Sequence, residues 1–307
     1  MGRRHGSSIR TSTKESEVSS SKEEAIPPSS SLNIIYAFVQ VSLGMAIVLL
    51  VVSQGIFDSA PVEVGYKYYA EKPDSKLGGF VFPDWIKMPA NTLVNVGYSI
   101  VGLHWLLKIF LLEQKGEVTH TGAYLHYVFA WMAVFYGPLQ FTRIITQSPR
   151  SAVIDQWVTL PFFAWASVWA KTLLVGWSTQ WALALMISSL LSYNMIFLHE
   201  QGFEIALLIH AINVFMPIWT VYNRYPAKGH LFNFACLVIC FLDFTVVKLY
   251  DLQLGEFHSF FTGLSGHFWS KIGDFLMIHF ASRLLLGVSE AKKLREETKV
   301  VTEKKKR

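Results

Sequence analysis

Charged residues are scarce in this chain. Asp, Glu, Lys and Arg make up 16% of its 307 residues, whereas an ordinary soluble domain has roughly 25%. Because apolar residues make up 52%, the composition argues against an ordinary soluble enzyme and favours a membrane protein. Cysteine is scarcer still, and Cys236 and Cys240 lie four positions apart in one apolar stretch. They have neither the two-residue gap nor the His partners of a structural zinc site, so we expect both to be packing residues.

The body of the chain lacks net charge. Residues 1–31 hold five Lys and Arg against four Asp and Glu, residues 288–307 hold eight against four, and the residues between them hold fourteen of each sign. The formal net charge of +5 therefore belongs to the two tails. Since the body has no basic surplus, we expect no nucleic-acid binding. We expect membrane lipids as partners, and the sequence identifies no protein partner.

The hydrophobic pattern predicts an all-α fold, a polytopic transmembrane helix bundle of about eight spans within residues 32–287. A helix needs an apolar run of about 20 residues to cross the hydrocarbon core of a bilayer. Such runs occur at 33–56, 91–112, 122–145, 153–174, 178–198, 203–223, 230–250 and 262–287. Residues 1–31, which contain no aromatic residue, have a composition typical of a disordered tail.

The charges of the loops and tails predict the orientation. Residues 57–90 contain five acidic and four basic residues together with aromatic ones, so we expect a lumenal or extracellular loop. Both tails are basic, which places both in the cytosol and requires an even number of spans. Eight spans satisfy this requirement, and six would satisfy it as well.

The end of the chain bears on location. The basic cytosolic tail, residues 288–307, ends Lys304-Lys305-Lys306-Arg307, the pattern of a dilysine retrieval signal for the endoplasmic reticulum. A basic tail that only follows the positive-inside tendency is the alternative. We expect an integral protein of the endoplasmic reticulum, the Golgi or another internal membrane.

Three ionisable residues share one face of the last apolar run. His267, Lys271 and Asp274 are spaced i, i+4, i+7, and such a face cannot point at lipid without a cost of a few kcal/mol per charge. We therefore expect it to face the bundle. Lys271 and Asp274 are also placed to pair at i, i+3. A salt bridge that only makes an inward-facing helix tolerable and a functional pocket both fit this pattern.

A fourth charge, Asp155, begins the fourth span. With both termini on one side, the topology predicts that polar residues of four spans meet at similar depth near the outer leaflet. They are Asn91, Asn95, Gln140, Arg143, Asp155, His267, Lys271 and Asp274. From this set we take Asp155, His267, Lys271 and Asp274 as candidate catalytic residues, and Asp243, Lys248 and Asp251 as a possible extension of the site.

Six segments carry a family resemblance. GIFDSAPVEVGYKYYAE, MPANTLVNVGYSIVGLHWL, FYGPLQFTRIITQ, IDQWVTLPFFAW, HEQGFEIAL and GHFWSKIGDFLMIHFA together resemble the transmembrane protein 187 family from about residue 40 to residue 285. The resemblance implies a polytopic membrane protein. That family has no established biochemical activity, so it supplies no catalytic residues to transfer.

A more distant resemblance concerns Asn91-Thr92-x-x-Asn95, which is similar to the NTxSN element of alkaline ceramidases in the CREST group of transmembrane hydrolases. In that group three His bind zinc and an Asp helps to hold the zinc-bound water. The order of the motifs would place Asp155 on this Asp and His267 on the first His of an HxxxH motif. The resemblance also implies that spans two to eight form a seven-helix core, preceded by one N-terminal helix. This chain departs from the pattern, because Lys271 stands where the second His belongs and Phe141 stands at the His of SxxxH.

The zinc ligand set is therefore incomplete, with His267 as its one candidate, whereas a catalytic zinc normally keeps three protein ligands. A protonated Lys271 would also repel a divalent ion. We expect no bound cofactor, with zinc as the alternative.

Two functions fit the sequence. The first is a non-catalytic lipid-binding or scaffold protein of internal membranes. The second is a CREST-like intramembrane hydrolase of a lipid amide or ester, in which Asp155 and His267 would activate water and Lys271 would stabilise an oxyanion. A transporter is less favoured, because no pair of interrupted half-helices occupies matching positions of two repeats.

Overall fold

A computed structural model describes residues 30–227 and 229–306 of the chain. The predicted disordered tail, residues 1–31, therefore lies almost wholly outside the described residues. The long helices are α1 (Ser30–Ser53), α3 (Val96–Gln114), α4 (His120–Thr146), α5 (Pro149–Val175), α6 (Thr179–Ser192), α7 (Gly202–Arg224), α8 (His230–Leu242) and α10 (Gly266–Lys306). The short elements are η1 (Tyr66–Tyr68), β1 (Lys76–Leu77), β2 (Phe80–Val81), α2 (Pro89–Leu93), η2 (Tyr193–Phe197), the π-helical η3 (Asp243–Val247), α9 (Asp251–Phe257) and η4 (Ser259–Thr262).

The predicted all-α polytopic bundle is confirmed. Within the described part of the chain, eight helical segments are long and apolar enough to cross a membrane. Their outward faces carry large apolar side chains that are more than half exposed, among them Leu43, Leu107, Leu191, Met216 and Ile239. A surface of this kind is unfavourable in water and suits the hydrocarbon core of a bilayer.

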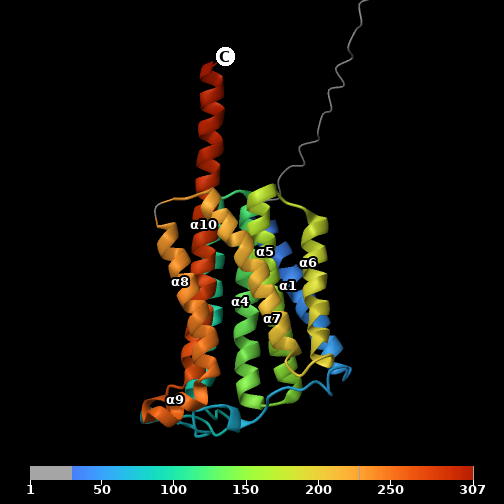
Figure 1. Cartoon of the computed structure of the whole chain (residues 1–307), viewed down its shortest axis with the longest axis vertical. Helices are drawn as coiled ribbons and strands as arrows, with labels where there is room; N and C mark the ends of the chain where they lie inside the picture. Colours follow the sequence, from blue (N-terminus) through green and yellow to red (C-terminus); the bar gives the residue numbers. More distant parts are fainter. Residues whose placement is uncertain (1–29, 228, 307) are drawn as a thin grey trace, which may run out of the picture.

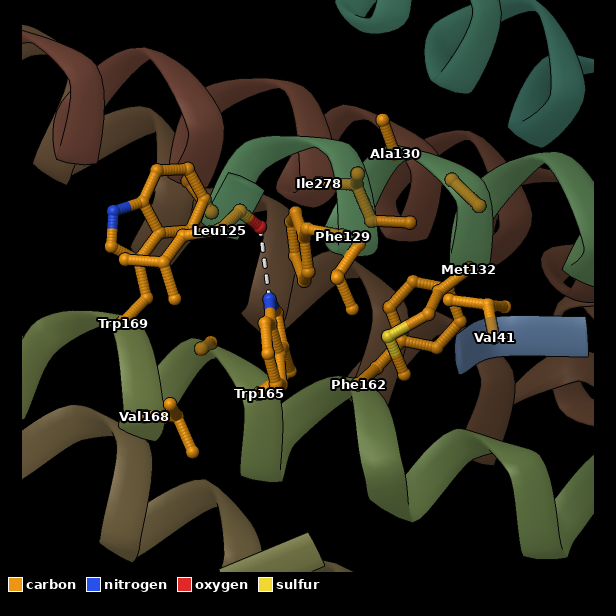
Figure 2. Close-up of a cluster of buried hydrophobic side chains, with 14 of the residues drawn as sticks. Val41, Leu125, Phe129, Ala130, Met132, Phe162, Trp165, Val168, Trp169 and Ile278 are labelled. Carbon is orange, nitrogen blue, oxygen red and sulfur yellow. Dashed lines mark hydrogen bonds between the residues drawn. The ribbon is translucent and has the colours of Figure 1, made fainter. Parts of the chain in front are cut away.

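Helix α5 forms the centre of the bundle and α1 lies at its edge. In the most apolar stretch of each helix, 72% of α5 but only 11% of α1 is buried. Helix α3 packs against α4, α5 against α7, and α8 against α10. Figure 2 shows the contact between α4 and α5, where the buried Trp165 indole donates a 2.9 Å hydrogen bond to the backbone oxygen of Leu125. This bond satisfies the one polar atom of a large apolar side chain.

The two ends of the bundle differ (Figure 1). One end carries residues 57–88 and α9, and we call it the loop end. At the opposite end, the tail end, α1 begins and α10 continues beyond the other helices as a single projecting helix. The last predicted span ends at residue 287. The helix that contains most of this span continues to Lys306, because the segment after Gly287 contains neither Gly nor Pro and is rich in good helix formers.

Local signals position the polar residues at the loop end. Ser148 caps α5 by accepting a 3.1 Å hydrogen bond from the Ser151 backbone, and Pro149 is the first residue of this helix. Both are favoured arrangements at a helix start. They place Asp155 less than two turns into α5, next to the last turns of α4.

Candidate functional site

Side chains from α4, α5 and α10 form a buried polar network at the loop end. The Lys271 ammonium donates a 2.8 Å hydrogen bond to Gln140 Oε1, and the Gln140 amide nitrogen donates to Asp155 Oδ1. The Tyr136 hydroxyl donates to the same oxygen at 2.9 Å, and Arg143 Nε lies 3.2 Å from Asp155 Oδ2. Both oxygens of this carboxylate are thus occupied, as a buried charge requires.

Asp274 lies beside this network but has a different partner. Its Oδ2 atom accepts a 2.5 Å hydrogen bond from the Tyr98 hydroxyl on α3. The Tyr98 ring meets the Tyr136 ring edge to face at 5.0 Å, and the Lys271 nitrogen lies 6.0 Å from the centroid of each ring. Lys271 and Asp274 therefore bind Gln140 and Tyr98, respectively, rather than forming the i, i+3 pair that their spacing allows.

His267 occupies the first turn of α10, and its contacts differ from those of Asp155. Its backbone nitrogen donates a 3.0 Å hydrogen bond to Asp251 Oδ1, and its ring packs edge to face on Tyr69 at 4.9 Å. Its Nε2 atom is buried and has no hydrogen-bond partner among the described residues. Because Asp155 instead binds Gln140, Tyr136 and Arg143, no hydrogen bond within the described part of the chain joins the two residues of the hydrolase hypothesis.

Carboxylates outside the spans fasten the 57–88 segment to the bundle. Glu71 accepts hydrogen bonds of 2.8 Å from the backbone nitrogens of Ala90 and Asn91 at the start of α2. Asp251 accepts at 3.0 Å from the Ala70 backbone as well as from His267. Burial raises the pKa of Glu71 to about 7 and raises the pKa of Asp251 above its ordinary value. The sequence analysis did not single out Glu71, because an acidic residue in a polar loop gives no sign that it will be buried.

The structure places the predicted polar residues at the loop end of the bundle, and contacts link them in smaller groups. Asn91 accepts a 2.9 Å hydrogen bond from Ser265, two residues before His267, and the Asn95 amide donates to the Asn91 backbone at 2.7 Å. Asp243 packs against Gly273 of α10. The roles assigned to Asp155, His267, Lys271 and Asp274 stay predictions.

An apolar cavity of about 360 Å³ opens beside the network, between α4, α5, α7, α8 and α10. Its wall consists of Phe, Leu, Ile, Val, Met and Ala side chains except at one place, where Tyr136, Thr159 and Asp274 line it. Ile212 and Met216 line it as well, and more than half of each side chain is exposed on the outer face of α7. The cavity therefore opens sideways on the surface that would face lipid.

The residues present do not fit a zinc site. Within the described part of the chain, no group of three or more His, Cys, Asp or Glu side chains is placed to hold a metal ion. Lys271, at the position of the second His in the CREST pattern, donates its hydrogen bond to Gln140. An ammonium group at that place is a donor and a positive charge, neither of which binds a cation.

Sequence reasoning missed the aromatic members of the site and a second network. Tyr98 and Tyr136 lie inside apolar runs. A Tyr buried in such a run needs a hydrogen-bond partner for its hydroxyl, and this requirement could have indicated that both side chains belong to the polar network. At the tail end, Glu113 accepts from Asn33 at 2.8 Å, from His120 at 2.9 Å and from Tyr127 at 2.8 Å. These bonds join α1, α3 and α4, and they give the buried Glu113 carboxylate its partners.

The fold and the site define a polytopic α-helical integral membrane protein. The chain belongs to the TMEM187 protein family, whose sequence profile matches residues 37–286. It is 41% identical over 245 residues to Transmembrane protein 187 of Homo sapiens, an alignment that covers 80% of this chain and 89% of the human protein. It is 39% identical over 252 residues to the Bos taurus protein of the same name, an alignment that covers 82% of this chain and 96% of the bovine protein.

No solved structure matches the chain. The family resemblance that the motifs indicated is confirmed by these matches. The more distant resemblance to the CREST group stays a prediction.

Proposed function

We propose that this protein is a non-catalytic lipid-binding protein and that the cavity between α4, α5, α7, α8 and α10 holds the lipid. The observation that carries this proposal is the composition of the cavity wall. The wall is apolar except at Tyr136, Thr159 and Asp274, and it opens sideways past the exposed Ile212 and Met216. A cavity of this kind, apolar with a few convergent polar groups, is the usual form of a small-molecule site.

The contacts of Asp155 favour binding over hydrolysis. General-base activation of water needs a group with a lone pair directed at that water. The Asp155 carboxylate accepts from Gln140 and Tyr136 and pairs with Arg143. His267 contacts Asp251 and Tyr69 and makes no hydrogen bond with Asp155 among the described residues. These partners support a structural role for the network.

Photolabelling tests the proposal. The full-length protein in phospholipid nanodiscs is irradiated with diazirine-bearing lipid probes, and labelled peptides are mapped by mass spectrometry. Peptides of α7 and α8 that line the cavity are expected to carry the label. Ala211→Phe, which fills the cavity from α7, is expected to lower the labelling severalfold.

Ala184→Phe is the matched control, because Ala184 is exposed on α6 and does not line the cavity. Labelling spread evenly over all outward faces, or unchanged in Ala211→Phe, would contradict the proposal and leave the scaffold function. Turnover of lipid amides or esters that is lost in Asp155→Asn would instead support the hydrolase.

We further propose an internal membrane, with both termini in the cytosol. The described chain begins and ends at the same end of the bundle (Figure 1), and its last residues are basic. Replacing Lys304 and Lys305 by Ser is expected to shift the protein to later membranes in fluorescence imaging, whereas Lys299→Ser is the control. Unchanged localisation on removing both lysines would contradict the retrieval signal, and protease protection of the tail would contradict the orientation.

A further inference from the structure

We propose that the lipid in this cavity carries a small headgroup that donates a hydrogen bond, a hydroxyl or an amine, and that Asp274 accepts this bond. The proposal rests on the lipid-binding function proposed above and names the class of lipid. The hydrogen-bond donors, acceptors and charges at the polar end of the cavity support it.

The hydroxyl groups at the polar end of the cavity already donate hydrogen bonds to protein atoms. The Tyr136 hydroxyl donates to Asp155 Oδ1 at 2.9 Å. The Thr159 hydroxyl donates to the backbone oxygen of Asp155 at 2.8 Å and lies 2.9 Å from the Tyr136 oxygen. Each hydroxyl has one hydrogen and two lone pairs. The cavity therefore offers lone pairs at this end, and a ligand must supply the donor.

Asp274 is the strongest of these acceptors. Its Oδ2 atom accepts from Tyr98, and its other oxygen accepts no hydrogen bond from the described residues, while the side chain lines the cavity and is buried. A carboxylate oxygen that faces an apolar cavity without a hydrogen-bond donor is costly. A hydroxyl or amine at the polar end removes that cost, and hydrogen bonds to ionised acceptors are roughly twice as strong as those between neutral groups.

The charges at the cavity wall disfavour an anionic headgroup. Among the described residues that line the cavity, Asp274 is the only charged one. The nearby cations do not line it. Lys271 donates to Gln140 at 2.8 Å, and Arg143 pairs with Asp155. A phosphate in the cavity would meet the Asp274 carboxylate in a low dielectric, and among the described residues no Lys or Arg lines the cavity to pair with it, which is unfavourable.

The shape of the cavity accommodates the rest of such a lipid. Beyond the polar end its wall is apolar, and Ile212 and Met216 mark the opening on the outer face of α7. The apolar body of the ligand fills the cavity, and a longer chain passes through the opening into the bilayer. This arrangement suits a molecule with one small polar group at the end of an apolar body.

Three probes with the same diazirine-bearing chain test the headgroup: a long-chain alcohol, a long-chain primary amine and an anionic phospholipid. In the full-length protein in phosphatidylcholine nanodiscs, the alcohol or the amine is expected to label cavity peptides about tenfold more than the phospholipid does. Equal or stronger labelling by the phospholipid would overturn the proposal.

Two substitutions separate hydroxyl from amine. Asp274→Asn keeps an acceptor oxygen and removes the charge, so it is expected to lower amine labelling about tenfold and alcohol labelling less. Asp274→Leu removes the acceptor and lowers both. Glu204→Gln is the control, since Glu204 is an exposed carboxylate at the start of α7 that does not line the cavity. If both Asp274 variants leave labelling unchanged, the proposal is overturned.

Competition in the unaltered protein keeps the test valid if a variant fails to fold. Excess unlabelled alcohol or amine is expected to displace the probe, and the phospholipid is not. If all probes label the cavity without preference, the headgroup proposal fails and lipid binding stands. If no probe labels it, the proposed function itself fails.

Discussion

Tyr98 on α3 and Asp274 on α10 are 176 residues apart in the sequence, and the Tyr98 hydroxyl donates a 2.5 Å hydrogen bond to the Asp274 carboxylate. This bond joins the second span to the last at the polar end of the cavity. It also leaves one Asp274 oxygen for a ligand. The site thus depends on a contact that closes the bundle.

Tyr98→Phe removes the only hydrogen bond that Asp274 receives from the described residues. We expect the free energy of unfolding in detergent to fall by about 1–3 kcal/mol, the cost of leaving a buried polar group without its partner. Tyr66→Phe, in the exposed part of the loop segment, is the matched control and should have little effect. Equal stability of the two variants would show that the bond contributes nothing.

Gln140 links Lys271 to Asp155. Gln140→Leu leaves the Lys271 ammonium without an acceptor, and Lys271→Met removes the charge itself. We expect each single variant to be destabilised by about 2–4 kcal/mol and the double variant by less than the sum, because the two changes remove one shared interaction. A double-mutant cycle from denaturant unfolding measures this difference. If the two single-variant losses of stability add up to that of the double variant, Gln140 and Lys271 do not share an interaction, and the proposed link is contradicted.

The Glu71 carboxyl makes the attachment of the loop segment sensitive to pH. Its pKa is raised from 4.5 to about 7, so between these values the folded state keeps a proton that the unfolded state has lost. The contribution of the protonated Glu71 carboxyl to the free energy of unfolding is fully present below pH 4.5 and is lost as the pH rises through 7. The difference of two and a half pKa units between the folded and unfolded states corresponds to about 3 kcal/mol of folding stability.

Hydrogen exchange measures this effect. After correction for the intrinsic pH dependence, residues 65–95 should exchange more slowly at pH 5 than at pH 8. Glu71→Gln should remove most of the difference, and Glu63→Gln, at an exposed position of the same segment, should keep it. Slower exchange at pH 8 would reverse the sign and refute the role of the buried carboxyl.

Metal binding gives a further prediction. Since the described residues contain no group placed to hold a metal ion, micromolar zinc or a chelator should leave the thermal unfolding midpoint unchanged, whereas a ligand that binds the folded state raises it. Metal analysis of the purified protein provides the complementary measurement. A stoichiometric zinc ion that is lost in His267→Ala would restore the hydrolase hypothesis.

The polar residues show what the sequence predicted well and what it could not. The placement of Gln140, Asp155, Lys271 and Asp274 at one end of the bundle followed from the order of the spans, because the depth of a residue in a membrane helix is set by its distance from the helix end. Their partners did not follow from that order. Lys271 binds Gln140 rather than Asp274, since the rotation of α10 against α4 determines which side chains meet.

The sequence by itself determined the class of protein and the family and indicated about eight spans, because the length of apolar runs and the order of motifs are properties of the linear chain. The tertiary structure decided the partner of each buried charge, the burial of Glu71 in a polar loop, and the cavity between five helices that ends at Asp274. These features arise from how the helices pack in three dimensions, and hydrophobic periodicity alone does not fix that packing.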